Sequence, residues 1–459
     1  MPRCSNGWTR SGAGVAAARI AGTALAAAAL AAPLAAQAGP SATLVADPSR
    51  PSIGLEEAIL RAQAVLPLVA QANAQLTNAS AQKRSAVGAY LPNLNATSNF
   101  GRLYSENARP DPITGAPVTA GSSVNSLAFG GNASLVLFDG FQRSATSKAA
   151  GATYASAEAG LIDARYQARL QVTQQFVAAL AAAQLVSVRE AALKRAEEQL
   201  RQAVARLRAG SATRSDSLRA RVQVGTAQQD LITALATLRG QEATLGQLVG
   251  DERPVAARED SSVYRRTAAL DRAALVAEAL AQSPQVTSAD RAAAAARASL
   301  TAAKRVYFPT ISLNGNVTWN GNNQVDYQLF NQRQLSLVLN WPLFNRFVRE
   351  QSITAQSAAA SVAEAQAADA RRQVAAAVES QLATLEAASE RVRLTQLNVT
   401  AAEEDLRVQN ERYRLGAATA LDVLTSQEAL TQAEVNVVSA RFDYARAKAQ
   451  LEALLGRTL

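Results

Sequence analysis

Histidine is absent from this 459-residue sequence, and cysteine occurs once, as Cys4. Histidine is the commonest general base and the commonest transition-metal ligand, so its absence argues against hydrolytic and metal-dependent chemistry. One cysteine cannot form an intramolecular disulfide, and a cysteine-ligated metal site needs several. We therefore expect no enzyme activity, no cofactor and no bound metal.

The first 38 residues have the three parts of a secretory signal peptide. Three arginines supply a basic region, an apolar run covers about 15–34, and 36–38 form a small-residue cleavage site. The mature chain is expected to begin near Gly39 and therefore to lack cysteine. Cys4 also lies too far upstream of the apolar run to become the lipid anchor of a lipoprotein. The alternative, an uncleaved membrane anchor, is disfavoured because the apolar run is short for a spanning helix.

The charge pattern argues against a nucleic-acid partner. The formal net charge is +9, but three of the positive charges belong to the predicted leader. Elsewhere arginines alternate with Glu and Asp, as on solvated helix faces, whereas a nucleic-acid site needs basic residues clustered with aromatic ones. The hydrophobic content of 48% excludes a disordered chain.

The sequence contains an internal repeat. Pro67, Tyr90 and Pro92 recur 217 residues later, as Pro284, Tyr307 and Pro309. Six further residues recur at a separation of 206, namely Phe138, Phe141, Gly210, Asp216, Leu245 and Gly250, which match Phe344, Phe347, Gly416, Asp422, Leu451 and Gly456. We predict two structural repeats, 39–260 and 261–459, with an 11-residue difference in a loop-bearing hairpin of the first.

Each repeat is expected to contain one very long helix, at 142–209 and 349–415, because these segments are nearly free of glycine and proline. At 1.5 Å per residue each would be about 100 Å long. Apolar residues recur every seven positions, which predicts a coiled-coil seam. The seam residues are Val172, Ala179, Val186, Leu193, Leu200 and Leu207, and then Val378, Leu385, Val392, Val399, Leu406 and Tyr413. Shorter helices are predicted at 55–89, 216–249, 270–306 and 422–455.

Two hairpins interrupt the helices, at about 93–138 and about 310–341. Apolar and polar residues alternate strictly from Thr310 to Asn320, and the first hairpin shows weaker alternation at 93–104 and 127–138. One apolar and one polar face over about ten residues is the pattern of a transmembrane β-strand. Aromatic residues also concentrate in both hairpins, as at a membrane interface. A soluble β-sandwich is the alternative.

Four strands cannot close a barrel, since about eight are needed to enclose a filled interior, and lipid forbids an open sheet edge. Several protomers must therefore share one barrel. The predicted fold class is mainly α with a membrane β-barrel portion, built from a duplicated helix–hairpin–helix repeat with four strands per protomer.

Several local motifs carry a resemblance to a known family. They are Tyr90-Leu91-Pro92, Tyr307-Phe308-Pro309, Leu137-Phe138-Asp139-Gly140, Leu421-Asp422-Val423-Leu424 and Ala440-Arg441-Phe442-Asp443-Tyr444. With these motifs the chain resembles the TolC-type outer-membrane efflux proteins over essentially the whole mature sequence. The resemblance implies a homotrimer with a 12-stranded barrel in outer-membrane lipid and a coiled-coil α-barrel, or tunnel, crossing the periplasm.

The implied function is that of a passive duct, opened by an inner-membrane transporter and its periplasmic adaptor protein, which exports proteins or small molecules. The lack of a lipoprotein cysteine favours a duct for type I secretion over one for drug or metal efflux. The alternative function is a periplasmic coiled-coil adaptor or scaffold of an efflux assembly. Such a protein should carry a domain of short strands, and here only two long hairpins interrupt the helices.

The resemblance also implies two kinds of site at the periplasmic tip. Gly210 and Gly416 match the glycines of turns on which the adaptor docks, although glycine also simply ends a helix because it tolerates positive φ. A docking site and a helix end are both consistent with these positions.

A periplasmic gate is implied at Tyr413, Asp216 and Asp422. In this gate the tyrosine would be hydrogen-bonded to Asp216, and Asp422 would form an acidic ring. Ala418 and Thr425 stand where an arginine and a second acid are expected. The alternative is that both aspartates are helix N-terminal caps and that Tyr413 is the last position of the seam.

Overall fold

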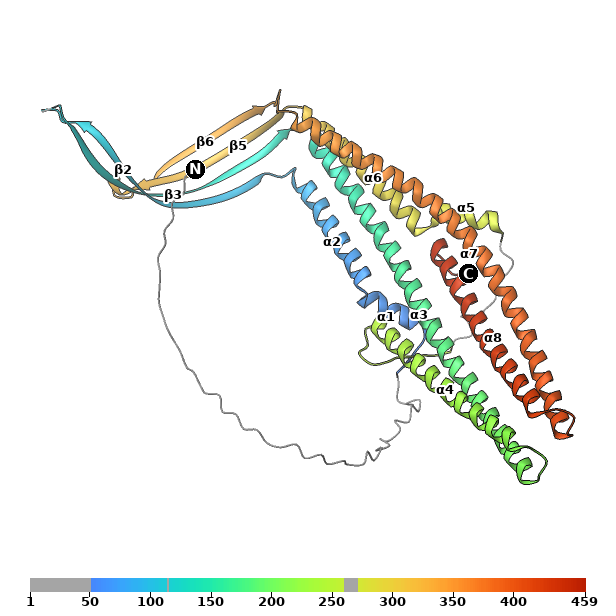
Figure 1. The fold of residues 1–459 in the computed structure, drawn as a ribbon. Coiled ribbons are helices and arrows are strands. Elements are labelled where there is room, and N and C mark those ends of the chain that lie inside the picture. The colour runs from blue at the N-terminus through green and yellow to red at the C-terminus, as the bar shows by residue number, and fades with distance from the viewer. Residues whose placement is uncertain (1–50, 114, 260–270) are drawn as a thin grey trace, which may run out of the picture. The chain divides into compact units, whose positions relative to one another are not determined.

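The computed structural model of the protein describes residues 51–113, 115–259 and 271–459 (Figure 1). The predicted signal peptide, residues 1–38, lies outside the described residues. The same series of elements occurs twice along the chain: two short helices, a β-hairpin, a long helix and a shorter helix. This order confirms a mainly helical fold with a duplicated repeat and four long strands.

The first series begins with two short helices, α1 (Leu55–Val65) and α2 (Pro67–Gly88). The hairpin strands β2 (Asn93–Pro110) and β3 (Pro117–Phe138) follow. Then come the long helix α3 (Gln142–Arg208) and the shorter helix α4 (Arg214–Val249). Two short strands, β1 (Ser52–Ile53) and β4 (Ala256–Ala257), pair in parallel beside this series.

The second series has the same order. It contains α5 (Arg272–Gln282), α6 (Pro284–Lys304), β5 (Thr310–Asn322), β6 (Phe330–Asn340), α7 (Val348–Arg414) and α8 (Ala420–Leu455). Two short 3₁₀ helices flank β5, η2 (Arg305–Tyr307) and η3 (Asn323–Val325).

The predicted single helices 55–89 and 270–306 were wrong, because each is broken at a proline. Leu66 and Ser283 have ψ values of 128° and 129°, and the next helix begins at Pro67 or Pro284. Proline lacks an N–H and clashes with a helical residue before it, so the preceding residue becomes extended and proline starts a new helix at its first position. Each pair of short helices therefore changes direction at the proline.

The long helices pack along several partners, and the two repeats bury matching residues. Helix α3 contacts α2, α4, α6 and α8, and α7 contacts α5, α6 and α8 (Figure 1). Val172, Phe176 and Leu245 are fully buried in the first core. Their counterparts 206 residues later, Val378, Leu382 and Leu451, occupy the second core. The predicted seam is therefore an internal surface in this part of both long helices.

The four long strands form one antiparallel sheet in the order β2-β3-β5-β6. The two outer strands, β2 and β6, each have an unpaired edge within the described chain. Leu94, Ala133, Gly315 and Leu335 lie side by side across the four strands, and so fall on one face. The sheet is open in the single chain, as expected for four strands.

The first hairpin is longer than the alternation predicted. A loop was expected to hold the 11 additional residues, but β2 and β3 continue to pair from Ser105↔Ser122 to Pro110↔Pro117. Strand β5 pairs with β3 only as far as Ser126↔Asn322, where the side-chain oxygen of Asn323 accepts a hydrogen bond from the Asn125 backbone at 2.9 Å. Two strands can pair through their backbones without an apolar face. The weak alternation of apolar and polar residues in this part of the hairpin therefore did not reveal that β2 and β3 continue to pair.

Candidate functional site

The chain reverses direction at two tight turns, one between α3 and α4 and one between α7 and α8. Gly210 and Gly416 lie in these turns with φ values of 73° and 79°, and no atom lies within 4 Å of where their Cβ would be. Their positive φ explains why glycine is favoured here, since other residues adopt this conformation at a cost. The space around both turns is open, so each tip is accessible in the protomer.

A capping box begins the helix after each turn. The Thr213 hydroxyl donates to Asp216 Oδ2 at 2.7 Å, and the Thr213 backbone N–H donates to the same oxygen at 3.1 Å. The Asp216 backbone N–H donates back to the Thr213 hydroxyl at 3.3 Å. Thr419 and Asp422 repeat this arrangement at the start of α8. Each aspartate thus satisfies backbone donors at a helix N-terminus.

These hydrogen bonds lower the pKa of both aspartates. The Thr213 hydroxyl, and then its backbone N–H, hold the pKa of Asp216 below its usual value. For Asp422 the backbone N–H of Thr419 is the larger cause, followed by the hydroxyl. A carboxyl group whose pKa is lower in the folded state stabilises the fold above its unfolded pKa, and that stabilisation is lost as the pH falls through the folded value.

We predict that Thr213→Ala lowers the free energy of unfolding by about 1 kcal/mol per protomer, the usual effect of losing a cap. The difference from the wild type should be present at neutral pH and should shrink as the pH falls through the folded pKa of Asp216, which lies below the usual value for an aspartate. Melting temperatures at several pH values measure this. Thr237→Ala, which removes a mid-helix hydroxyl bonded to Thr233 O, is the matched control and should change little. Equal shifts for both variants would contradict the prediction.

Tyr413 is almost fully buried, at 6% exposure, in a small core cluster with Leu406, Ala420, Val423 and Leu430. Its hydroxyl has no hydrogen-bond partner within the described part of the chain. The hydrogen bond expected between Tyr413 and Asp216 is therefore not formed in this protomer, because Asp216 faces Thr213 instead. The structure places both residues at the tips without bringing them together.

Arg206, which the sequence did not single out, does reach Tyr413. Its guanidinium carbon lies 4.1 Å from the centroid of the Tyr413 ring. Its Nη2 donates to the backbone carbonyl of Arg414 at 2.9 Å. Arg206 lies at the end of α3 and Arg414 at the end of α7, so this one side chain connects two helix tips that are 208 positions apart.

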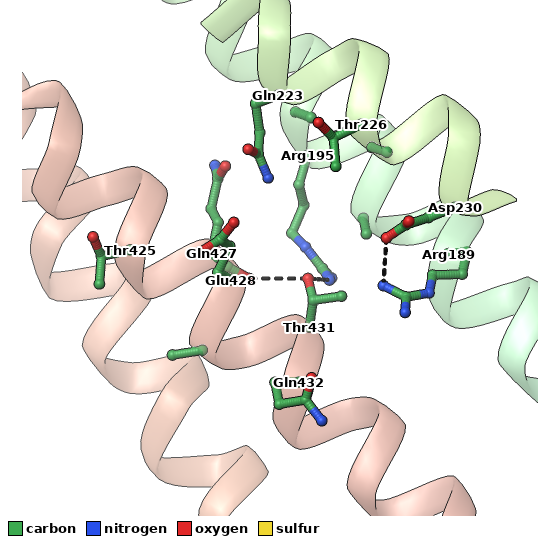
Figure 2. Close-up of a pocket in the computed structure, with 14 residues that line it drawn as sticks. Arg189, Arg195, Gln223, Thr226, Asp230, Thr425, Gln427, Glu428, Thr431 and Gln432 are labelled. Atoms are coloured by element: carbon green, nitrogen blue, oxygen red, sulfur yellow. Dashed lines mark hydrogen bonds and ion pairs between the residues drawn. The ribbon is translucent and has the colours of Figure 1, made fainter. Parts of the chain in front are cut away.

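A polar cluster joins α3, α4 and α8 further from the tips. Arg195 on α3 binds both oxygens of Glu434 on α8, at 3.1 and 2.7 Å, and also donates to Thr431 at 3.2 Å. Arg189 pairs with Asp230 on α4 at 3.0 Å. Figure 2 shows both arginines among the residues that line a cavity of about 530 Å³ between the three helices. The cluster was missed because its members are far apart in sequence.

Aromatic side chains mark the passages between strands and helices. Phe138 packs edge-on against Phe141, and Phe344 packs in the same way against Phe347. On the sheet itself, Phe129 stacks on Trp319 with centroids 5.4 Å apart. Among the described residues no group of three or more Asp, Glu, Cys or His could hold a metal ion.

Comparisons with known proteins agree with this architecture. A family model described as outer membrane efflux protein matches residues 58–251 and 275–457. The outer membrane efflux protein BepC of Brucella suis is 27% identical over 326 residues, or 70% of each chain.

Solved structures of low sequence identity share the fold. VceC, an outer membrane protein of Vibrio cholerae, is 20% identical with a TM-score of 0.71, covering 88% of this chain and 96% of that one. The CmeC outer membrane channel of Campylobacter jejuni is 15% identical with a TM-score of 0.74, covering 88% and 85%.

Proposed function

Because the chain belongs to the outer membrane efflux protein family, we propose that it is a passive duct that carries proteins or small molecules from an inner-membrane transporter to the cell exterior. As a member of this family the protein is an efflux channel of the outer membrane that extends into the periplasm. The proposed assembly is a homotrimer in which three four-stranded sheets close one 12-stranded barrel, and the long helices form a tunnel.

The open sheet is the observation that carries this proposal. Strands β2 and β6 have unpaired backbone edges, which lipid cannot satisfy, so β6 of one protomer must pair with β2 of the next. One face of the sheet is apolar and unpartnered: Leu335, Leu337 and Leu339 on β6 are 75%, 66% and 65% exposed. Such a band fits the lipid-facing surface of a barrel.

The helix tips fit the proposed contact with a periplasmic adaptor protein. The turns at Gly210 and Gly416 are open, and the adjoining side chains of Leu415 and Leu421 are 79% and 55% exposed. Exposed apolar residues beside a glycine turn suit a protein partner, since such surfaces mark interaction sites when they cluster. We keep Gly210 and Gly416 as the proposed docking positions.

Tyr413, Asp216 and Asp422 remain the proposed gate, with roles adjusted to their surroundings. The two aspartates belong to the capping boxes that begin α4 and α8, and we propose that their carboxylates line the periplasmic end of the tunnel. Tyr413 acts through its ring, which is held between a core cluster and Arg206.

Planar-bilayer recording of the purified mature chain tests the proposed function. We expect a detergent-solubilised oligomer that inserts and conducts in discrete steps, because the sealed barrel and the tunnel enclose one water-filled path. A stable, soluble periplasmic monomer that never inserts would contradict the duct and favour the alternative, a coiled-coil scaffold.

A further inference from the structure

We propose that Arg206 is a clasp that holds the tips of the α3–α4 and α7–α8 hairpins together and thereby keeps the periplasmic end of the tunnel closed. The inference rests on the proposed function, since it concerns the gate of that channel. It assigns a positioning role to Arg206, which acts by holding the two hairpin tips together.

Two contacts satisfy the guanidinium, and both belong to the end of α7. The ring of Tyr413 offers its electron-rich face at 4.1 Å, within the range of a cation–π contact. The carbonyl of Arg414 accepts from Nη2 at 2.9 Å. Arg414 is the last residue of α7, where carbonyls lack intrahelical donors and the helix dipole is negative. A cation from α3 therefore suits this helix end in two independent ways.

The position of the contact makes it a clasp between the hairpins. Helix α7 packs along α5, α6 and α8, whereas α3 packs along α2, α4, α6 and α8. Arg206 reaches across from α3 to α7 at the tips, about 16 Å along α3 from the Arg195–Glu434 pair. The last turns of the hairpins can separate only if Arg206 leaves Tyr413 and Arg414.

The Tyr413 hydroxyl does not contribute to the clasp. It is buried and has no partner in the described chain, so the ring rather than the hydroxyl meets Arg206.

Conductance of the purified full mature oligomer tests the clasp. Arg206→Gln should raise the resting ratio of open to closed channel roughly 2- to 30-fold per protomer, the range of a cation–π contact expressed as a ratio. Arg208→Gln, which removes the same charge from an exposed position in the same helical turn, is the matched control and should conduct like the wild type. Tyr413→Leu, which removes the ring that Arg206 contacts, should raise resting conductance as Arg206→Gln does.

A reversible cross-link keeps the test decisive if Arg206→Gln fails to assemble. The double variant Arg206→Cys with Tyr413→Cys, in a mature chain that otherwise lacks cysteine, can be joined by a short reducible cross-linker. We expect resting conductance to fall on cross-linking and to rise on reduction. The clasp is overturned if conductance does not change on cross-linking, or if Arg206→Gln and Arg208→Gln conduct equally. A wild type that never conducts overturns the channel itself.

Discussion

Gly140→Ala should sharply reduce the amount of assembled oligomer in the outer membrane. Gly140 lies between β3 and α3 with φ of 63°, and a Cβ added there would overlap the Cβ of Phe308. The left-handed backbone alone costs a non-glycine residue about 1 to 2 kcal/mol, and the overlap adds to this. The neighbouring Asp139 is buried and fixed by Arg143, so the junction has little freedom to adjust.

Heat-stable oligomer on a gel, together with its melting temperature, measures this effect. Gly151→Ala is the matched control, because Gly151 lies inside α3 with no atom within 4 Å of the added Cβ. Alanine is the better helix former by about 1 kcal/mol, so this variant should be slightly more stable than the wild type. If Gly140→Ala assembled and melted like the wild type, the junction would be more flexible than its geometry indicates.

Breaking the ion pair between Arg195 and Glu434 should give the second largest loss of stability. The two side chains are only 24% and 21% exposed, and the arginine makes a two-point contact with the carboxylate. Removal of one partner leaves a charge with poor access to water. We expect Arg195→Met to lower the free energy of unfolding by about 2 kcal/mol per protomer, in the range measured for hydrogen bonds to charged groups.

A double-mutant cycle separates the pair from its surroundings. Arg195→Met combined with Glu434→Leu should cost less than the sum of the two single variants, because neither charge is then left unpaired. Arg201→Met is the control, since Arg201 and its partner Glu198 are 63% and 53% exposed and such pairs contribute under about 1 kcal/mol. Additive losses in the cycle would mean that the two side chains act independently.

The fold follows from patterns that are local in sequence. The seven-residue seam and the strict alternation from Thr310 to Asn320 identify helix and strand because burial of one face imposes the same period on the chain. Where burial is weak the pattern fades. The outer part of the first hairpin pairs through polar backbone without an apolar face, and its length therefore escaped prediction.

The site was less predictable because its key contacts are long-range. Arg206 and Tyr413 lie in different repeats, as do Arg195 and Glu434, and an arginine in a helix rich in arginines carries no local sign of its partner. The capping boxes are local by contrast, although only their aspartates were considered as possible caps from the sequence. Thr213 and Asp216 are three positions apart, and that spacing is itself the signature of a helix start.

In the proposed trimer, the unequal hairpins determine the symmetry of the barrel rim. Strands β2 and β3 have 18 and 22 residues, against 13 and 11 for β5 and β6. Two equal repeats in each of three protomers would give a rim close to sixfold rotation. Because the paired ribbon of the first hairpin continues roughly 30 Å past the end of β5, tall and short hairpins must alternate and the rim keeps only threefold rotation. The proposed barrel would then carry three tall hairpins at this rim, each separated from the next by a short one.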